Sequence, residues 1–257
     1  MNAHSPNYDF VVKQAFRDDP RARVLDYGCG TGILVRRALD AFPDGDMYGV
    51  DTFEGFYENW QAKLPPELTG RIRRIEDGHI PFPDDHFDVI VSNQVFEHID
   101  DPPPYLREIR RVLKPGGRFL ALFPDREIWW EGHLGLWLPH RLDRFPRLQA
   151  GYIHAMRKLG FGYYKGNRTI RDWAVSRTKC LREVCFYHRN RDIMRWWREV
   201  FGAPPQSLAR DYMLFRIGAS PRMARFLPMA RLPLAGPFLE FVCVKRAGLV
   251  LDVRKAG

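Results

Sequence analysis

The chain has 257 residues, 45% of them hydrophobic, and a net charge of +9, which suits one large α/β domain with additions. The charge is uneven, since residues 1–128 carry 16 Lys and Arg against 22 Asp and Glu, whereas residues 129–257 carry 24 against 9. The first ten residues lack a signal-peptide core, and no uninterrupted apolar stretch approaches the roughly 18 residues of a membrane span. We therefore exclude secreted and membrane-spanning classes and expect a cytoplasmic protein.

The chain begins with a predicted helix over residues 8–16, and a predicted strand follows that ends in D-Y-G-C-G-T-G at residues 26–32. The three glycines allow a sharp turn and the close approach of a ligand, and the N–H groups that open the next helix favour a carboxylate or phosphate. The dinucleotide motif G-x-G-x-x-G would need a glycine at Ile33. Hydride transfer is therefore the second-best interpretation.

The second predicted strand, residues 47–50, follows an amphipathic helix over residues 33–42 and ends at Asp51. A carboxylate at a strand tip can accept two hydrogen bonds from ribose hydroxyls, and its charge makes such bonds roughly twice as strong as neutral ones. The alternative is that Asp51 caps a helix over residues 54–64.

A short third strand is expected at residues 71–75, and an apolar fourth strand that ends at Asn93 follows a proline- and aspartate-rich turn. Glu97 and His98 come next, then an amphipathic helix, the turn K-P-G-G and a fifth strand at residues 118–123. The run D-P-P-P-Y at residues 101–105 lies past the fourth strand tip. We interpret it as the start of a helix and not as an amine-binding D-P-P-Y site.

Residues 26–32 resemble the first motif of class I S-adenosylmethionine (SAM) dependent methyltransferases, and the sequences P-F-x-D-x-x-F-D-x-I, E-H-I and R-V-L-K-P-G-G resemble the branch that includes ubiquinone and menaquinone biosynthesis methyltransferases. This resemblance covers residues 23–123. It implies SAM as cofactor and a Rossmann-like, doubly wound α/β sheet, mostly parallel with an antiparallel last strand. It also implies that Asp77 accepts from the adenine amino group, with Glu76 as an alternative if the third strand ends earlier. The implied cofactor-binding residues are Asp26, Gly28, Gly30, Gly32, Asp51, Thr52, Asp77, Gly78 and Asn93.

The rest of the chain divides into two parts after the SAM-binding core of residues 1–123. Residues 124–189 are too long for a simple connection and are rich in Trp, Tyr and His, which predicts a substrate cap over the carboxyl ends of the strands. Residues 190–257 are expected to complete the sheet with a helix at 190–201 and strands at 212–217 and 238–244. Between these strands, residues 221–236 mix apolar side chains with arginines, which predicts a helix or a membrane-surface segment.

SAM carries an activated methyl group, so the chain needs mainly to align the reactants and exclude water. A phenol or alcohol acceptor gains from a base, and His133 and His98 are the candidates, with structural hydrogen bonds as the alternative for both. We expect no metal, because the four cysteines show no C-x-x-C spacing and are predicted to be reduced structural thiols.

The expected function is SAM-dependent methyl transfer, to oxygen, on a small or lipid- or sugar-linked acceptor. The basic second half predicts that the acceptor is anionic or that the protein contacts an anionic membrane, although a solvated basic face would look the same. An RNA or protein methyltransferase is a rival interpretation, but the chain has no recognisable RNA-binding module. A non-catalytic SAM-binding partner subunit is a rival of another class.

Overall fold

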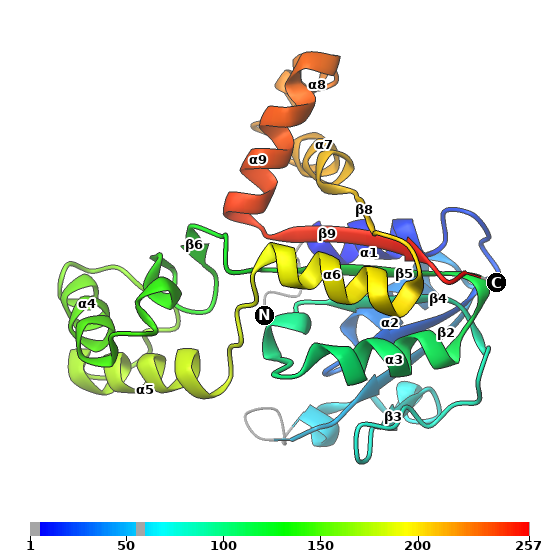
Figure 1. Cartoon of the computed structure of the whole chain (residues 1–257), viewed down its shortest axis with the longest axis horizontal. Coiled ribbons are helices and arrows are strands. Elements are labelled where there is room, and N and C mark those ends of the chain that lie inside the picture. The colour runs from blue at the N-terminus through cyan, green and yellow to red at the C-terminus, as the bar shows by residue number, and fades with distance from the viewer. Residues whose placement is uncertain (1–5, 55–59, 257) are drawn as a thin grey trace.

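The computed structural model describes residues 6–54 and 60–256, and a seven-stranded sheet lies at its centre (Figure 1). The strand order is β3-β2-β1-β4-β5-β9-β8, in which the first five pair in parallel and β9 is antiparallel to both β5 and β8. The predicted sheet class, mostly parallel with an antiparallel last strand, is thereby confirmed. The bounds are β1 Arg23–Tyr27, β2 Asp46–Asp51, β3 Ile72–Arg74, β4 Phe87–Asn93, β5 Leu113–Phe123, β8 Gln206–Ser207 and β9 Leu249–Arg254.

Helices cover both faces of this sheet and bury one apolar cluster on each side. One face is covered by α1 (Pro6–Ala15), α2 (Ile33–Ala41) and α7 (Ala209–Ala219), whose side chains join the first cluster. The other face is covered by α3 (Pro102–Val112) and α6 (Asn190–Phe201). The chain order of the strands reverses between β1 and β4, and at such a point open α/β sheets bind their ligands beyond the carboxyl ends of the strands.

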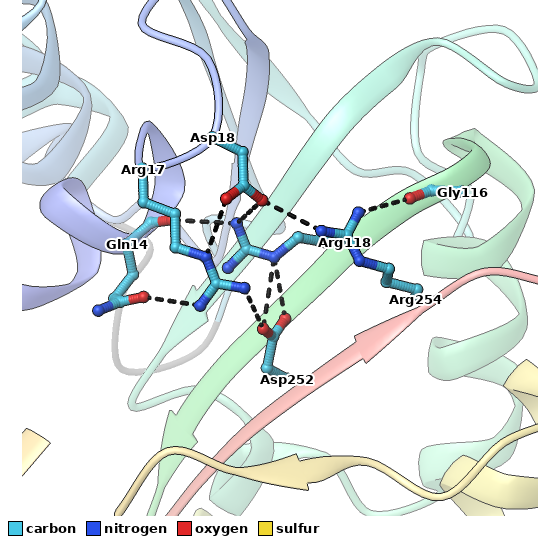
Figure 2. Close-up of polar contacts among 7 residues, drawn as sticks. All are labelled: Gln14, Arg17, Asp18, Gly116, Arg118, Asp252 and Arg254. Carbon is cyan, nitrogen blue, oxygen red and sulfur yellow. Dashed lines mark hydrogen bonds and ion pairs between the residues drawn. The ribbon is translucent and has the colours of Figure 1, made fainter. Parts of the chain in front are cut away.

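A buried ion-pair network fastens α1 to the two antiparallel strands (Figure 2). Arg118 on β5 is 1% exposed, and its Nε lies 3.3 Å from both carboxylate oxygens of Asp252 on β9. Arg17 and Asp18, just after α1, complete the network, because Arg17 donates to Asp252 at 3.1 Å and Asp18 accepts from Arg118 at 3.3 Å. Arg118 and Asp252 are buried, so each of these two charges depends on its partner.

Residues 124–189 form a lobe that projects from one side of the α/β core (Figure 1). The lobe contains the hairpin of β6 (Trp130–Glu131) and β7 (Leu136–Trp137) and the helices α4 (Pro146–Lys158) and α5 (Ile170–Glu183). These elements enclose a small apolar cluster around Trp173, which is fully buried. The lobe therefore has a core of its own.

The strands predicted at residues 212–217 and 238–244 are wrong, because both segments are helical. The first lies in α7, and the second lies in α9 (Gly236–Arg246). On α9 the buried Leu239 and Cys243 are four residues apart, which is the helical spacing, but their apolar neighbours hide this period in the sequence. The last strands are instead β8 and β9.

The segment at residues 221–236 contains short helical turns and α8 (Leu227–Ala230). Together α7, α8 and α9 rise above β9 as a second projection, which we call the apolar arm (Figure 1). Within the described residues no single helix is long and apolar enough to cross a membrane. Taken together, the two helical segments Ala224–Ala230 and Pro233–Arg246 have the length and composition of a membrane span, but the chain bends by 103° between them.

Candidate active site

The turn after β1 adopts a backbone conformation that requires its glycines. Gly28, Gly30 and Gly32 have φ angles of 77°, 54° and 73°, in the left-handed region that side chains disfavour. A Cβ on Gly28 would lie 2.3 Å from Val95, and one on Gly30 would lie 2.5 Å from the Trp60 ring. Any larger residue would therefore be strained and would also displace these neighbours.

Asp51 ends β2 beside this turn, as predicted. One carboxylate oxygen accepts from the Gly30 N–H at 2.8 Å, and the other accepts from the Phe53 N–H at 3.0 Å. Each carboxylate oxygen can accept a second hydrogen bond, so the group can hold the turn and still bind two hydroxyls. The alternative, a cap on a helix over residues 54–64, includes residues 55–59, which lie outside the described residues.

The remaining predicted cofactor residues lie at the same edge of the sheet. Asp26 on β1 is 3% exposed, and burial, with a smaller contribution from the charge of Asp51, raises its pKa to about 8. Asn93 ends β4, and its Oδ1 is buried without a hydrogen-bond partner among the described residues. Asp77 and Gly78 form a turn shortly after β3, with φ angles of 51° and 73°. Thr52 follows Asp51 directly, so the predicted set gathers at the carboxyl ends of β1, β2, β3 and β4.

The two candidate histidines, predicted from separate segments, lie next to each other. His98 ends a short 3-10 turn (Phe96–His98) just after β4, and His133 lies in the loop between β6 and β7. Their ring centroids are 5.2 Å apart and the rings meet edge to face. The structure thus brings the lobe into contact with the tip of β4, and we call this place the junction.

A buried carboxylate fixes the orientation of His133. The Nδ1 of His133 lies 2.7 Å from Oε1 of Glu131, which is fully buried and also accepts from the Tyr187 hydroxyl at 2.6 Å. Burial would raise the pKa of Glu131, but the hydrogen bonds and the charge of His133 outweigh it and lower the pKa. Burial would lower the pKa of His133, but Glu131 outweighs it and raises this pKa to about 9. His133 is therefore protonated at neutral pH unless something displaces its proton.

The sequence did not single out Glu131, Tyr187 or Cys185 as functional residues. Cys185 lies 4.0 Å from the Nδ1 of His133, although it is 52 residues away in the chain. A local signal existed only for Glu131, which precedes His133 by two residues. His140 also packs on Tyr187, with ring centroids 4.7 Å apart, whereas His154 lies on α4.

Two pockets that share Arg126 are lined mainly by residues of the lobe and of the start of α6. The first, of about 480 Å³, is lined by four arginines together with Glu127 and Asn190. The second, of about 310 Å³, has Cys185 and Tyr187 in its wall and shares Arg126 with the first. Arg126 is paired with Asp143 at 2.7 Å, so its charge is partly compensated. The arginines of the first pocket are Arg126, Arg141, Arg189 and Arg191.

The strand order, the glycine turn and the acid at the tip of β2 together define a class I SAM-dependent methyltransferase fold. The comparison with solved structures agrees with this class. A SAM-dependent methyltransferase from Mesorhizobium loti superposes with a TM-score of 0.52 at 20% sequence identity, covering 96% of this chain and 99% of that one.

Residues 25–121 match the family model described as a methyltransferase domain. The demethylmenaquinone methyltransferase of Symbiobacterium thermophilum is 36% identical over 118 residues, which cover 44% of this chain and 46% of that protein. The malonyl-[acyl-carrier protein] O-methyltransferase of Geobacter sulfurreducens is 33% identical over 105 residues, 40% and 39% of the two chains. Each match thus spans less than half of the relative's length, within which the predicted resemblance is confirmed.

Proposed function

We propose that the chain transfers the methyl group of SAM to an oxygen atom of an anionic, lipid-linked acceptor at a membrane surface. The glycine turn and Asp51 are the observation that carries the methyl-transfer part, because together they offer backbone N–H groups and a carboxylate at the reversal of strand order. The likeness to a malonyl-[acyl-carrier protein] O-methyltransferase supports oxygen as the target.

Each cofactor residue has a physical role in this proposal. The Asp51 carboxylate accepts from the ribose hydroxyls, and the glycine turn admits the body of the cofactor without steric conflict. Asp77 accepts from the adenine amino group, and the unpartnered Asn93 Oδ1 accepts from the polar amino-acid end of the cofactor. Asp26 lies buried on β1 just before the turn, where a bound cation would favour its ionised form.

The arginine-lined pocket favours an anionic acceptor. Its lining carries four guanidinium groups, of which Arg141 pairs with Glu127 at 3.4 Å, Arg126 pairs with Asp143 and Arg191 lies 3.8 Å from Asp192, so the net positive charge is smaller than four. Arg189 and Arg191 flank the start of α6, where they reach the pocket from the core side. Planar guanidinium groups bind phosphate and carboxylate oxygens in pairs, which suits an acceptor that carries either group.

The apolar arm favours a membrane as the place of reaction. Leu234, Phe238 and Met229 are 93%, 66% and 61% exposed, and Glu240 is the single acidic residue between positions 220 and 246, against five Lys and Arg. An exposed apolar surface with basic residues around it matches the interface of an anionic bilayer, where each basic residue contributes on the order of 1 kcal/mol. We therefore propose that the apolar arm binds an anionic lipid surface.

The arm is continuous with the lobe that carries the junction. Trp129, before β6, packs on Phe241 of α9 with ring centroids 5.6 Å apart, and its N–H donates to the Lys245 carbonyl at 2.8 Å. Arg246 stacks over the Trp130 ring at 4.7 Å. A lipid-linked acceptor anchored beneath the arm would thus reach the lobe without leaving the membrane surface.

His133 and His98 remain our candidates for receiving the proton of an acceptor hydroxyl, a role that His133 can take only above its pKa of about 9. Both lie at the junction, His98 in the segment after β4 and His133 in the hairpin loop of the lobe. Their neighbour Cys185 lines the second pocket. His133 has its Nδ1 proton fixed by Glu131, which is how a carboxylate orients a catalytic imidazole.

The reaction is tested by incubating the protein with SAM labelled in the methyl group and, separately, total lipid, water-soluble metabolites and RNA of the source cells. We expect label in the lipid fraction, on species retained by an anion exchanger. Arg189→Ala with Arg191→Ala should lower kcat/KM for that fraction, whereas Arg195→Ala, on the same helix outside the pocket lining, should not. Label in RNA or protein alone, or no label with SAM bound, would refute the proposed acceptor.

Membrane contact is tested with anionic vesicles, neutral vesicles and RNA over a salt series. We expect binding to anionic vesicles that weakens as salt rises, because screening acts over about 8 Å at physiological ionic strength. Replacing Leu234 and Phe238 by Ser should abolish it, whereas Leu159→Ser, 72% exposed on the lobe, should not. Equal binding to all three, or vesicle binding that survives loss of both side chains, would refute the role of the arm.

A further inference from the structure

Three potential metal ligands meet at the junction. One ring nitrogen each of His98 and His133 and the Sγ of Cys185 lie within 4.8 Å of one another. They come from the segment after β4, the hairpin loop of the lobe and the segment after α5, so the fold and not a local motif brings them together. Imidazole and thiolate are the ligands that zinc prefers, at Zn–N distances of about 2.0–2.1 Å and Zn–S of about 2.3 Å.

Each imidazole has its Nδ1 fixed by an acceptor, as in many metal-bound histidines, and the second ring proton of His133 must leave before its Nε2 can bind a metal. The Nδ1 of His98 lies 2.7 Å from the Val184 carbonyl, which can only accept, so Nδ1 carries the proton and Nε2 the lone pair. The Nδ1 of His133 lies 2.7 Å from the Glu131 carboxylate, which holds a proton on Nδ1 in the same way. Metal-bound histidines typically donate their second N–H to a carbonyl or carboxylate. The two histidines show one of each arrangement.

A second carboxylate at the junction lacks a hydrogen-bond partner among the described residues. Glu97 is 1% exposed, and both its carboxylate oxygens are buried without a hydrogen-bond partner among the described residues. Glu131, in contrast, accepts from Tyr187 and from the N–H groups of His133 and Leu134, at distances between 2.6 and 2.9 Å. A buried carboxylate without partners is costly, and a divalent cation beside it would remove that cost.

We propose that His98, His133 and Cys185 bind one zinc ion, with Glu131 orienting His133 and Glu97 adding a negative charge. Binding releases the Cys185 thiol proton to solvent, together with the second ring proton of His133. The zinc and one thiolate then carry a net charge of +1, and with the ionised Glu97 and Glu131 the site sums to −1. Three protein ligands leave the fourth position open, as in zinc sites that bind water or substrate. Cys185 lines the 310 Å³ pocket, which gives the ion a route from solvent.

This site goes beyond the proposed reaction and alters one part of it. In the zinc-bound protein the His133 lone pair is engaged by the metal, so His133 cannot receive the acceptor proton. A hydroxyl at the open position would instead be acidified by the ion, as zinc lowers the pKa of bound water to about 7. Zinc binding itself does not depend on methyl transfer, and the two are measured separately.

The test uses the full chain, freed of metal by a chelator and kept reduced, and titrated with Zn²⁺ and with Co²⁺. We expect one ion per chain, and a thiolate-to-cobalt charge-transfer band in the wild-type spectrum. Cys185→Ser and His98→Gln should lose the stoichiometric ion. Glu131→Gln should weaken zinc binding by roughly 10- to 100-fold, the usual effect of losing a partner that orients a ligand. Cys243→Ser is the control, because Cys243 is buried in the first core cluster and bonds to the Gly248 carbonyl.

SAM affinity of each variant, measured by calorimetry, reports whether the cofactor half remains folded. A wild-type protein that binds no ion stoichiometrically, or binds cobalt without a thiolate band, would overturn the site whatever the variants do. Equal zinc affinity of wild type and a folded Cys185→Ser would overturn it as well. Neither result would affect SAM binding or label transfer, so failure of the zinc site and failure of the proposed function are distinguishable.

Discussion

Replacing Asp51 is the most direct test of the cofactor site. Its two carboxylate oxygens accept from the Gly30 and Phe53 N–H groups at 2.8 and 3.0 Å, and in the proposed complex they also accept from the two ribose hydroxyls. A hydrogen bond to a charged group contributes about 1.5–3 kcal/mol, but water replaces part of it in the variant. We therefore expect Asp51→Ala to weaken SAM binding by 10- to 100-fold, about 1.4 to 3 kcal/mol.

Calorimetric titration of SAM into wild type and variant measures this change directly. Asp46→Asn is the matched control, because Asp46 begins the same strand at the opposite edge of the sheet and pairs there with Arg23 at 2.9 Å. It should leave SAM affinity unchanged. The thermal unfolding midpoint without SAM shows whether the Asp51→Ala variant keeps its fold. If that variant is unfolded, Asp51→Asn is used in its place, because asparagine has nearly the same volume as aspartate. A folded Asp51 variant with wild-type SAM affinity would refute the role of this carboxylate.

Three further predictions concern stability and titration. Asp252→Ala should lower the free energy of unfolding by about 3–5 kcal/mol in urea denaturation, because it removes the buried partner of Arg118 and leaves that guanidinium only the exposed Asp18 carboxylate as an ion-pair partner. In metal-free protein, the His133 imidazole should titrate near pH 9 by NMR, and Glu131→Gln should lower the pKa of His133. The contribution of His133 to the free energy of unfolding should be lost as pH rises from 6.5 through 9. Burial lowers the pKa of His140 to about 4, so wild-type stability should fall as pH falls from 6.5 to 4, and His140→Gln should flatten that decline.

The outcomes that would contradict these three predictions are equally specific. An Asp252→Ala variant within about 1 kcal/mol of wild type would mean that the buried charges are solvated and contribute little. A His133 pKa near 6.5 in the metal-free protein, unchanged by Glu131→Gln, would mean that the contact with Glu131 is not formed in solution. An equally steep acid decline in His140→Gln would assign the loss of stability to other groups.

The cofactor half could be predicted from the sequence because its determinants are local. A strand, a glycine turn and a helix occupy consecutive residues, and the acid at the tip of β2 follows at the spacing that one crossover helix imposes. The glycine pattern itself requires positive φ angles, which the structure shows at Gly28, Gly30 and Gly32. The resemblance to known motifs and the conformational preference of glycine therefore both identified the turn after β1.

The end of the sheet could not be predicted in the same way. β9 lies between β5 and β8 with both faces covered, so it lacks the alternation of apolar and polar residues that marks a half-exposed strand. Asp252 interrupts its apolar run, and it is buried there only because Arg118 from β5 pairs with it. Since that partner is 134 residues away in the chain, the sequence alone did not indicate that a charged residue lies within a strand here, and the last strand was predicted at residues 238–244 instead.

The junction likewise could not be predicted, because its residues are far apart in the chain, and here the missed feature bears on function. A zinc site with ligands at fixed local spacing is visible in a sequence, but His98, His133 and Cys185 lie 35 and 52 residues apart on three segments. The apolar core of the lobe, around Trp173, sets the distance between the last two, and the contact of the Phe186 N–H with the Glu97 carbonyl at 2.6 Å ties that segment to the tip of β4. Glu97 is buried by the same contact. Packing therefore places a carboxylate without hydrogen-bond partners among the described residues beside two imidazoles and a thiol, and this is the property that makes the junction a site for a cation.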